Sequence, residues 1–408
     1  MKILIKTRHF KQISILIIIG IFFVYCNISD YSSSIDLTKN HSVSVFDVFS
    51  DVKAIKLETS EDCLISEINR IQYYDSRYYI LDARSQQIFC FDENGSFEYK
   101  INAQGRGKGE YHYITDFAID EKNKQMVVLD PVVQRVHFFD LNGNFISSHD
   151  IKSDKVFGLF RVYPLQDSLL LLTSLTYESL LFYSLKKEKI VYADFNFNEP
   201  SGLHAFSPLD NVYFFDDKVL FLVPLSQEVV DVTSMVPETH FIWCFGSNNN
   251  SAQQVNRLLD EIRMKEKLGE GFSVSAQAVG KDKILNHHIM KSFENRRFRI
   301  AMIEFDNDIK FVLIDKNYNQ TFVFKSFTEG IRLPFHTVQA DRAIIFHIPE
   351  FGPKDIDAIK SAGLEDYYFG RNRTFYTAEI LHEDCRHIVE NHDPMTDNPF
   401  LVVYKFKE

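Results

Sequence analysis

The sequence predicts an all-β protein, a six-bladed β-propeller made of four-stranded antiparallel blades. The first observation is a repeat: the stretch "FCFDENGSFEYKI" from Phe89 is matched 48 residues later by "HFFDLNGNFISSHDI" from His137. The second is that each copy reads as three apolar runs separated by turns. A meander of this kind cannot bury both faces alone, so copies must stack, and a period of about 48 residues suits a propeller blade.

The Asp-x-Asn-Gly turn is the strongest local signal in each copy. It occurs at Asp92–Gly95 and again at Asp140–Gly143. Asn-Gly between apolar segments indicates a hairpin, because both residues tolerate the positive φ that a tight turn requires. Each copy is therefore expected to form a small antiparallel meander.

The blade count follows from the length that remains. Beyond Ile151 the copies decay, but short apolar runs separated by turns continue to the C-terminus. A propeller domain over residues 43–408, with blades of about 48 to 60 residues, gives six blades, with seven as the alternative. A ring must hide its first and last edges. We therefore expect Asn398–Glu408 to pair with the segment from Ser42, whose alternation predicts two short strands.

Two segments break the strand pattern and predict helical insertions. Ser251–Leu268 carries apolar residues at helical spacing and is followed by Gly269. Pro353–Leu364 is a shorter candidate with a proline near its first turn. Excursions from a rigid frame commonly carry binding surfaces. Covering an exposed sheet edge is the simpler alternative.

The N-terminus predicts export. Ile13–Val24 is an apolar run of 12 residues behind a basic region, shorter than the span of about 20 that crosses a bilayer but suited to a signal peptide over residues 1–25. The run ends at Cys26, which resembles the lipidated cysteine of a bacterial lipoprotein signal. Residues 26–42 would then be a lipidated tether. Phe23 and Tyr25 depart from that pattern, and plain secretion and an uncleaved anchor stay open.

Composition narrows the function classes. The chain has 408 residues, 45% of them apolar, with 38 Phe and 19 Tyr, which supplies a large core. A net charge of −11 disfavours nucleic acid or an anionic bilayer as a partner attracted by bulk charge. Cys63, Cys90, Cys244 and Cys385 are widely spaced, which fits packed free thiols better than a disulfide framework or a zinc site.

With the export signal, the repeated Leu-Asp and Phe-Asp-x-Asn-Gly-x-Phe pattern and the segment "GRGKGEY" at Gly105–Tyr111, the chain resembles the six-bladed β-propeller lipoproteins of Bacteroidetes. These are similar in shape to NHL-repeat propellers. The resemblance covers about residues 43–408, and Lys108 stands where the family's inter-blade segment commonly has proline. It implies an envelope location, with the outer membrane as the expected site, and an architecture more than a chemistry.

Three short motifs suggest sites but fail on spacing or context. Gly105-x-Gly107-x-Gly109 lacks the following helix of a nucleotide site. His382 and His387 stand five residues apart, whereas helical zinc ligands stand four apart. Asp315–Gln320 lacks the glycine of a calcium loop and reads as a hairpin turn. No metal or cofactor is predicted.

Two functions remain. The preferred hypothesis is a non-catalytic binding or scaffold lipoprotein that presents a propeller face to a protein or glycan, with Arg106, Lys108 and Tyr111 as exposed candidates. The alternative is a propeller hydrolase, lyase or lactonase, whose site at the central channel would need carboxylates converging from several blades. Glu67, Asn69 and Asp116 are the channel candidates. The ligand and the oligomeric state are left open.

Overall fold

The structure is a computed structural model that describes most of the propeller domain. The described residues are 34–151, 158–174, 178–196, 211–268, 279, 283–333, 338–340, 343–348 and 379–408. The signal peptide, Cys26, the first part of the tether and the helix predicted at Pro353–Leu364 lie outside them.

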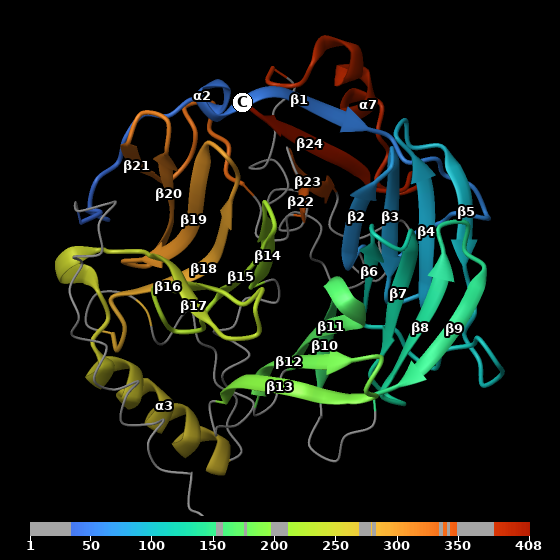
Figure 1. Ribbon diagram of the computed structural model, residues 1–408. Coiled ribbons are helices and arrows are strands. Elements are labelled where there is room, and N and C mark those ends of the chain that lie inside the picture. The colour runs from blue at the N-terminus through green and yellow to red at the C-terminus, as the bar shows by residue number, and fades with distance from the viewer. Residues whose placement is uncertain are drawn as a thin grey trace, which may run out of the picture.

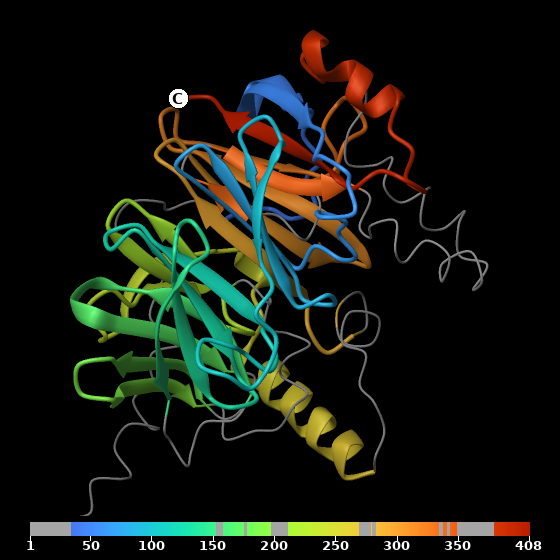
Figure 2. The ribbon, with the colours of Figure 1, turned by 90° about the vertical axis from the view of Figure 1, so that its right-hand side faces the viewer.

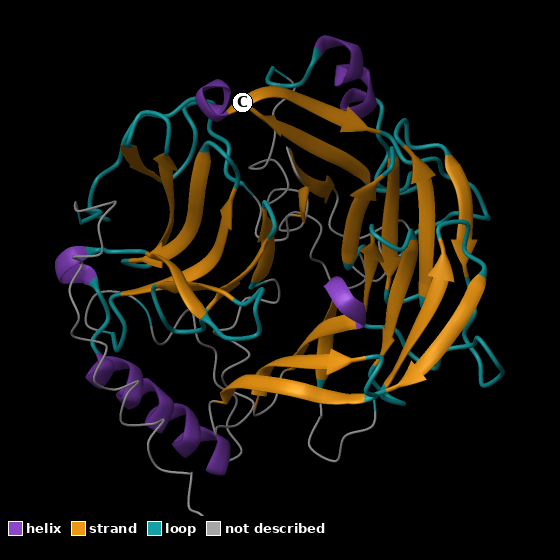
Figure 3. Ribbon diagram, in the orientation of Figure 1, coloured by secondary structure: helices purple, strands orange, loops and turns teal. Residues whose placement is uncertain are grey.

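Six four-stranded antiparallel sheets surround a central axis, which confirms the predicted six-bladed propeller (Figures 1 and 3). Blades 1 and 2 contain β2 (Arg70–Tyr74), β3 (Arg77–Asp82), β4 (Gln87–Asp92) and β5 (Phe97–Ile101), then β6 (Asp116–Asp120), β7 (Gln125–Asp130), β8 (Arg135–Asp140) and β9 (Phe145–Asp150). Blades 3 and 4 contain β10 (Leu159–Pro164), β11 (Leu169–Ser174), β12 (Glu178–Ser184) and β13 (Lys189–Asn196), then β14 (Val212–Phe215), β15 (Lys218–Leu222), β16 (Glu228–Asp231) and β17 (Glu238–Ile242). Blade 5 contains β18 (His287–Glu294), β19 (Phe298–Phe305), β20 (Asp308–Asp315) and β21 (Gln320–Phe324).

The closing blade joins the two ends of the domain. It contains β22 (Val338–Ala340), β23 (Ala343–Ile348), β24 (Phe400–Phe406) and β1 (Phe49–Ile55). β1 pairs antiparallel with β24, with Phe49 opposite Phe406 and Ile55 opposite Leu401. The predicted pairing of the C-terminal strand with the N-terminal segment is confirmed, and it turns the N-terminal strand into the outer edge of the last blade.

The first of the two short strands predicted after Ser42 is instead a helical turn, α2 (Val45–Val48). The Ser44 amide donates to Asp47 Oδ2 at 2.8 Å, and the Phe46 amide donates to Ser44 Oγ at 3.1 Å. This reciprocal cap stabilises a helix start. The turn still buries Val45 and Val48, so the apolar spacing that suggested a strand is satisfied by a different backbone.

Residues 34–42 were expected to belong to a tether, but they pack against the propeller. Ile35 and Leu37 are buried between blades 4 and 5. The Ile35 amide donates to the Cys244 carbonyl at 2.7 Å, and the Lys310 ammonium donates to the Lys39 carbonyl at 3.1 Å. The apolar residues at alternate positions explain the change, because they give this polar segment one buried face. The described residues 34–42 therefore pack with the propeller, unlike the expected tether.

The core lies between neighbouring blades. In β3, Tyr78 and Ile80 belong to a cluster shared with the closing blade, whereas Tyr79 and Leu81 belong to a cluster shared with blade 2. Successive strand residues point to opposite faces, and here both faces are covered. This explains why the inner strands read as continuous apolar runs.

The repeated aspartates of the two sequence copies hold turns. Asp82 accepts the Ser66 amide at Oδ2, 2.6 Å, and the Arg84 amide at Oδ1, 3.1 Å. Asp130 makes the corresponding bonds to the amides of His112 at 2.7 Å and Val132 at 3.1 Å. Each carboxylate thereby joins a strand turn to the segment that enters its blade.

The second pair of repeated aspartates organises the Asn-Gly hairpins. Asp92 Oδ1 accepts the amides of Asn94 and Ser96, both at 2.8 Å. Gly95 and Gly143 have φ of 85° and 84°, whereas neither Asn94 nor Asn142 takes a positive φ. The hairpins are confirmed, but only the glycine uses the left-handed conformation that was expected of both residues.

The predicted helix at Ser251–Leu268 is confirmed as α3 (Ala252–Lys267), which follows blade 4 and the short turn η3 (Gly246–Asn248). Ser251 and Gln254 cap its start through reciprocal side-chain bonds to each other's amides. The other short elements are η1 (Gln166–Ser168), η4 (Glu383–Cys385) and α7 (Arg386–Glu390). Among the helices that the structure describes, none has the length and apolar character to cross a membrane.

Candidate functional site

Asp116, the channel candidate on β6, lies in a buried ion cluster formed by the innermost strands of three blades. Its Oδ1 is 3.2 Å from Arg161 Nη1 of β10 and 3.4 Å from Arg70 Nε of β2. Its Oδ2 accepts the Val162 amide at 2.9 Å. The side chain of Asp116 is 0% exposed. The carboxylate is thus bonded to both neighbouring blades and tied into the frame.

Glu67 and Asn69, the other two channel candidates, lie together just before β2. Asn69 Nδ2 donates to Glu67 Oε1 at 3.0 Å, and Asn69 Oδ1 accepts the Ala83 amide at 2.7 Å. Asn69 is exposed. Asp116 bonds Arg70, Arg161 and Val162, which come from β2 and β10. Within the described ranges, no group of three His, Cys, Asp or Glu side chains could hold a metal ion.

The Gly105–Tyr111 segment is a pinned inter-blade turn, as predicted. The Gly105 amide donates to the Tyr111 carbonyl at 2.9 Å, and the Gly107 amide donates to Glu110 Oε2 at 2.6 Å. Arg106 and Lys108 are exposed on it. The segment leads into the strand β6, whereas a nucleotide-binding loop would lead into a helix. The segment is therefore a turn between blades.

Tyr111 was expected to be exposed, and this expectation is wrong. The side chain is 0% exposed in the core between blades 1 and 2. Its hydroxyl donates to the Gln86 carbonyl at 2.7 Å and accepts the Ala103 amide at 3.1 Å. Burial raises the pKa of Tyr111 to about 12. An aromatic ring beside a glycine-rich turn fills the space that the small residues leave, so Tyr111 anchors the turn.

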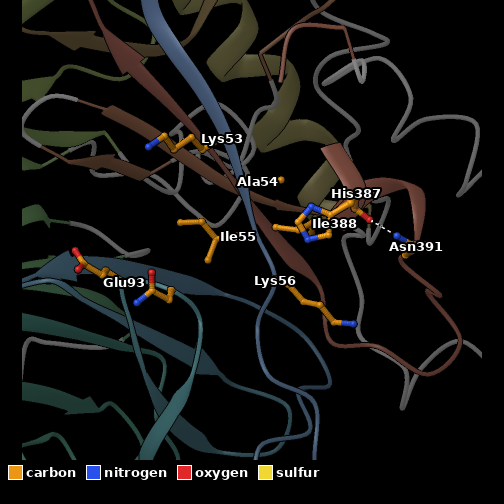
Figure 4. A pocket seen from close by; sticks show the side chains of 9 residues that line it. Lys53, Ala54, Ile55, Lys56, Glu93, His387, Ile388 and Asn391 are labelled. Atoms are coloured by element: carbon orange, nitrogen blue, oxygen red, sulfur yellow. Dashed lines mark hydrogen bonds between the residues drawn. The ribbon is translucent and has the colours of Figure 1, made fainter. Parts of the chain in front are cut away.

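A groove lies at the rim of the ring. It has a volume of about 530 Å³ and lies between β1, the β4–β5 turn and α7 (Figure 4). Its lining residues are Lys53, Ala54, Ile55, Lys56, Glu93, Asn94, His387, Ile388 and Asn391. We call this cavity the rim groove. It lies where the closing blade meets blade 1.

The rim groove combines charged groups with an apolar strip. Lys53 Nζ is 3.7 Å from Asp51, and Lys56 Nζ is 3.3 Å from Asp397. These ion pairs are solvent-exposed and therefore weak, so both ammonium groups stay available to a ligand. Ile55 and Ile388 are partly buried and supply apolar surface beside them. The set suits a ligand that has acidic or hydroxyl groups along one apolar face.

Backbone contacts hold the walls of the rim groove in place. The Glu58 amide donates to the Gly95 carbonyl at 2.8 Å, and a Cβ at Gly95 would lie 2.0 Å from the Lys56 carbonyl oxygen. The β4–β5 turn is therefore seated directly against the segment that follows β1. On the other wall, Asn391 Nδ2 donates to the His387 carbonyl at 2.8 Å.

Sequence reasoning did not find the rim groove, because its residues come from three distant segments, 53–56, 93–94 and 387–391. One signal was available: the predicted pairing of the chain ends brings residues near 55 beside residues near 400. The two histidines of "HEDCRH" also separate. His382 precedes the short turn η4, where its Nδ1 accepts the Asp384 amide, whereas His387 reaches the groove.

Other predicted features lie where expected. Asp315 ends β20 and Gln320 begins β21, so this segment is a hairpin turn. Cys63, Cys90, Cys244 and Cys385 are free thiols, and three of them are buried. Burial raises the pKa of Cys90 to about 12, which disfavours the reactive thiolate.

One solved structure of another protein agrees with this fold. This is the structure of a Bacteroides fragilis protein named "Putative exported protein", which has a TM-score of 0.65 and 16% sequence identity to this chain. The alignment covers 90% of this chain and 98% of the B. fragilis chain. A member of the DUF4221 family from Bacteroides vulgatus has a TM-score of 0.49 and 10% identity, covering 90% of this chain and 99% of its own. No curated protein matches. The family described as "Domain of unknown function (DUF4934)" matches residues 32–350. Because that match spans more than half of the 408 residues, the chain belongs to the DUF4934 family.

Proposed function

We propose that this protein is a non-catalytic binding module held at the cell envelope by a lipid on Cys26, and that it binds a protein or glycan through the rim groove. The observation that carries the proposal is the rim groove itself. It places two lysines, a histidine and two asparagines around an apolar strip on a rigid frame. Binding sites typically combine apolar surface with a few positioned polar groups.

The charge environment of Asp116 supports binding over the channel-enzyme alternative. The Asp116 carboxylate is enclosed by Arg70 and Arg161 and accepts the Val162 amide. Such a group suits the role of joining blades 1, 2 and 3 better than proton transfer. The hydrolase, lyase or lactonase alternative would need a different set of acids.

The proposed location rests on the sequence and on resemblance. The apolar run before Cys26 has the length of a signal-peptide core. The B. fragilis protein that shares the fold is named as exported. Export followed by lipidation of Cys26 would place the propeller at the envelope, with the outer membrane as the expected site.

The test is crosslinking and capture of the tagged protein from intact envelopes. We would compare the wild type, Cys26→Ala, and the groove double variant Lys53→Glu with Lys56→Glu. Lys122→Glu is the matched control, because Lys122 is an exposed lysine on the β6–β7 turn of blade 2. A partner captured by the wild type and the control, but lost from the groove variant, supports the proposal.

Three outcomes would contradict it. Equal recovery of the partner by the groove variant would place binding on another surface. Recovery of nothing by any form would favour small ligands or channel chemistry. Loss of the partner from Cys26→Ala alone would show that anchoring, rather than the groove, controls the encounter.

A further inference from the structure

The described chain begins at a defined place on the rim, between blades 4 and 5. Ser34 lies beside Gly246, where a Cβ added to the glycine would be 3.1 Å from the Ser34 Cβ. The next residue, Ile35, is buried and bonded to Cys244. Lys310 and Val323 of blade 5 then hold residues 37–41 through backbone bonds. The first described residues therefore lie against blades 4 and 5.

The chain from Cys26 to Ser34 is short. It contains eight peptide steps, and covalent geometry limits their extended length to about 28 Å. This inference rests on the proposed lipidation of Cys26. If that cysteine is inserted in a bilayer, the rim at blades 4 and 5 cannot lie farther than this from the lipid surface.

α3 starts close to the same point. It begins six residues after Gly246 and is 16 residues long, which corresponds to about 24 Å. Leu258 and Ile262 face a small apolar cluster that contains Ile284 and Leu285, so one face of the helix is fixed to the protein. Figure 2 shows α3 projecting from the body of the propeller.

The outward face of α3 carries apolar side chains at its C-terminal end. Met264 is 62% exposed and Leu268, one turn later, is 68% exposed. Lys265 and Lys267 lie in the same last turn. Exposed apolar residues next to lysines are the composition of helices that rest in a membrane interface, where the apolar groups enter the lipid and the ammonium groups stay at the headgroups.

We propose that the C-terminal turn of α3 rests on the lipid bilayer that holds the anchor, with Met264 and Leu268 inserted at the interface. The anchor supplies the proximity, so the contact does not depend on bulk charge, which is negative for this chain. A tether and a weak second contact reinforce each other, because the second contact forms at high effective concentration. The propeller is thereby oriented with blades 4 and 5 toward the membrane and blades 1 and 2 away from it.

The test measures contact with lipid at two matched positions. The full-length acylated protein would be reconstituted into phosphatidylcholine vesicles, with and without bromine on the acyl chains, as Met264→Trp or Ile146→Trp. Ile146 is 52% exposed on β9 of blade 2, on the far side of the ring. The wild type supplies the background from Trp243, the single natural tryptophan, which is buried.

We expect brominated lipid to quench the added tryptophan in Met264→Trp and to leave that in Ile146→Trp unchanged. Equal quenching at both positions, or none at Met264→Trp in protein that floats with the vesicles, would overturn the proposed orientation. Failure of lipidation can be distinguished from failure of the α3 contact. Without lipidation, the N-terminal peptide would have the mass of the unacylated form, and the protein would not float with the vesicles.

Discussion

Glu304 shows at the scale of one residue how burial changes a carboxyl group. Among the described residues its Oε2 has no hydrogen-bond partner, and His288 Nδ1 on the paired strand is 4.0 Å away. The side chain is 9% exposed, and burial raises its pKa to about 7. The group is therefore protonated in the fold at pH values where it would be ionised in the unfolded chain.

Glu304→Gln should change the pH dependence of stability. The contribution of Glu304 to wild-type stability should fall as the pH rises from about 4.5 to 7, because the unfolded chain releases a proton that Glu304 keeps in the fold. Glutamine cannot ionise, so the variant should match the wild type near about pH 4 and be more stable by up to about 3 kcal/mol near about pH 8. Urea unfolding followed by Trp243 fluorescence measures this. If the free energies of unfolding of Glu304→Gln and the wild type differed by the same amount at both pH values, Glu304 would already be ionised in the fold.

Tyr111 should prove structural. Tyr111→Phe removes two hydrogen bonds and should lower the free energy of unfolding by about 1–2 kcal/mol. Tyr111→Ala also opens a cavity and should cost about 3–5 kcal/mol. The double variant Arg106→Ala with Lys108→Ala is the control, and it should stay within about 0.5 kcal/mol of the wild type. A Tyr111→Ala variant as stable as the wild type would contradict the buried, structural role of Tyr111.

At the scale of the element, the two repeat copies show why a turn sequence recurs. Asp92 and Asp140 bond the amides of their own hairpins, and the glycine three residues later takes a positive φ. The same hairpin also makes a tertiary contact, because Gly95 lies against the Lys56 carbonyl. A turn that local chemistry specifies thereby becomes a wall of the rim groove.

Gly95→Ala should separate these two roles when compared with Gly330→Ala. Both glycines have positive φ, but a Cβ at Gly330 would meet nothing within 4 Å. Gly330→Ala should therefore show only the conformational strain, about 1–2 kcal/mol. Gly95→Ala adds a clash with backbone and should cost about 1–3 kcal/mol more. Thermal unfolding measures the difference, and equal losses would mean that the β4–β5 turn can move away from β1.

At the scale of the whole molecule, ring closure joins residues from both ends of the chain. β1 completes a sheet whose other three strands come from beyond residue 337. The segment before β1 also crosses blades 4 and 5, where Ile35 and Leu37 are buried. A propeller closed in this way ties both ends of the chain into one sheet. It also makes stability a property of the ring rather than of one blade.

Acid should destabilise the ring through buried histidines. Burial lowers the pKa of His137 in blade 2 and that of His392 next to the closing blade, and it lowers the pKa of His287 in blade 5 to about 4. The unfolded chain binds these protons first, so stability should fall as the pH drops from about 6.5 toward 4. His137→Met should lose less stability than the wild type between about pH 7 and pH 5 in urea unfolding. An unchanged loss would show that His137 accepts a proton without unfolding.

The sequence alone determined the blade repeat, the Asp-x-Asn-Gly hairpins, the six blades, the pairing of the chain ends and helix α3. The repeat, the hairpins, the blade count and the helix follow from turn chemistry and apolar spacing, which are local. The pairing of the chain ends follows from the need of a ring to hide its first and last edges. Only the tertiary structure decided that Tyr111 is buried, that Asp116 joins three blades, that residues 34–42 are packed and that the rim groove exists. Each of these features depends on which residues from distant parts of the chain come into contact when the blades close into a ring. The local sequence pattern does not specify those contacts.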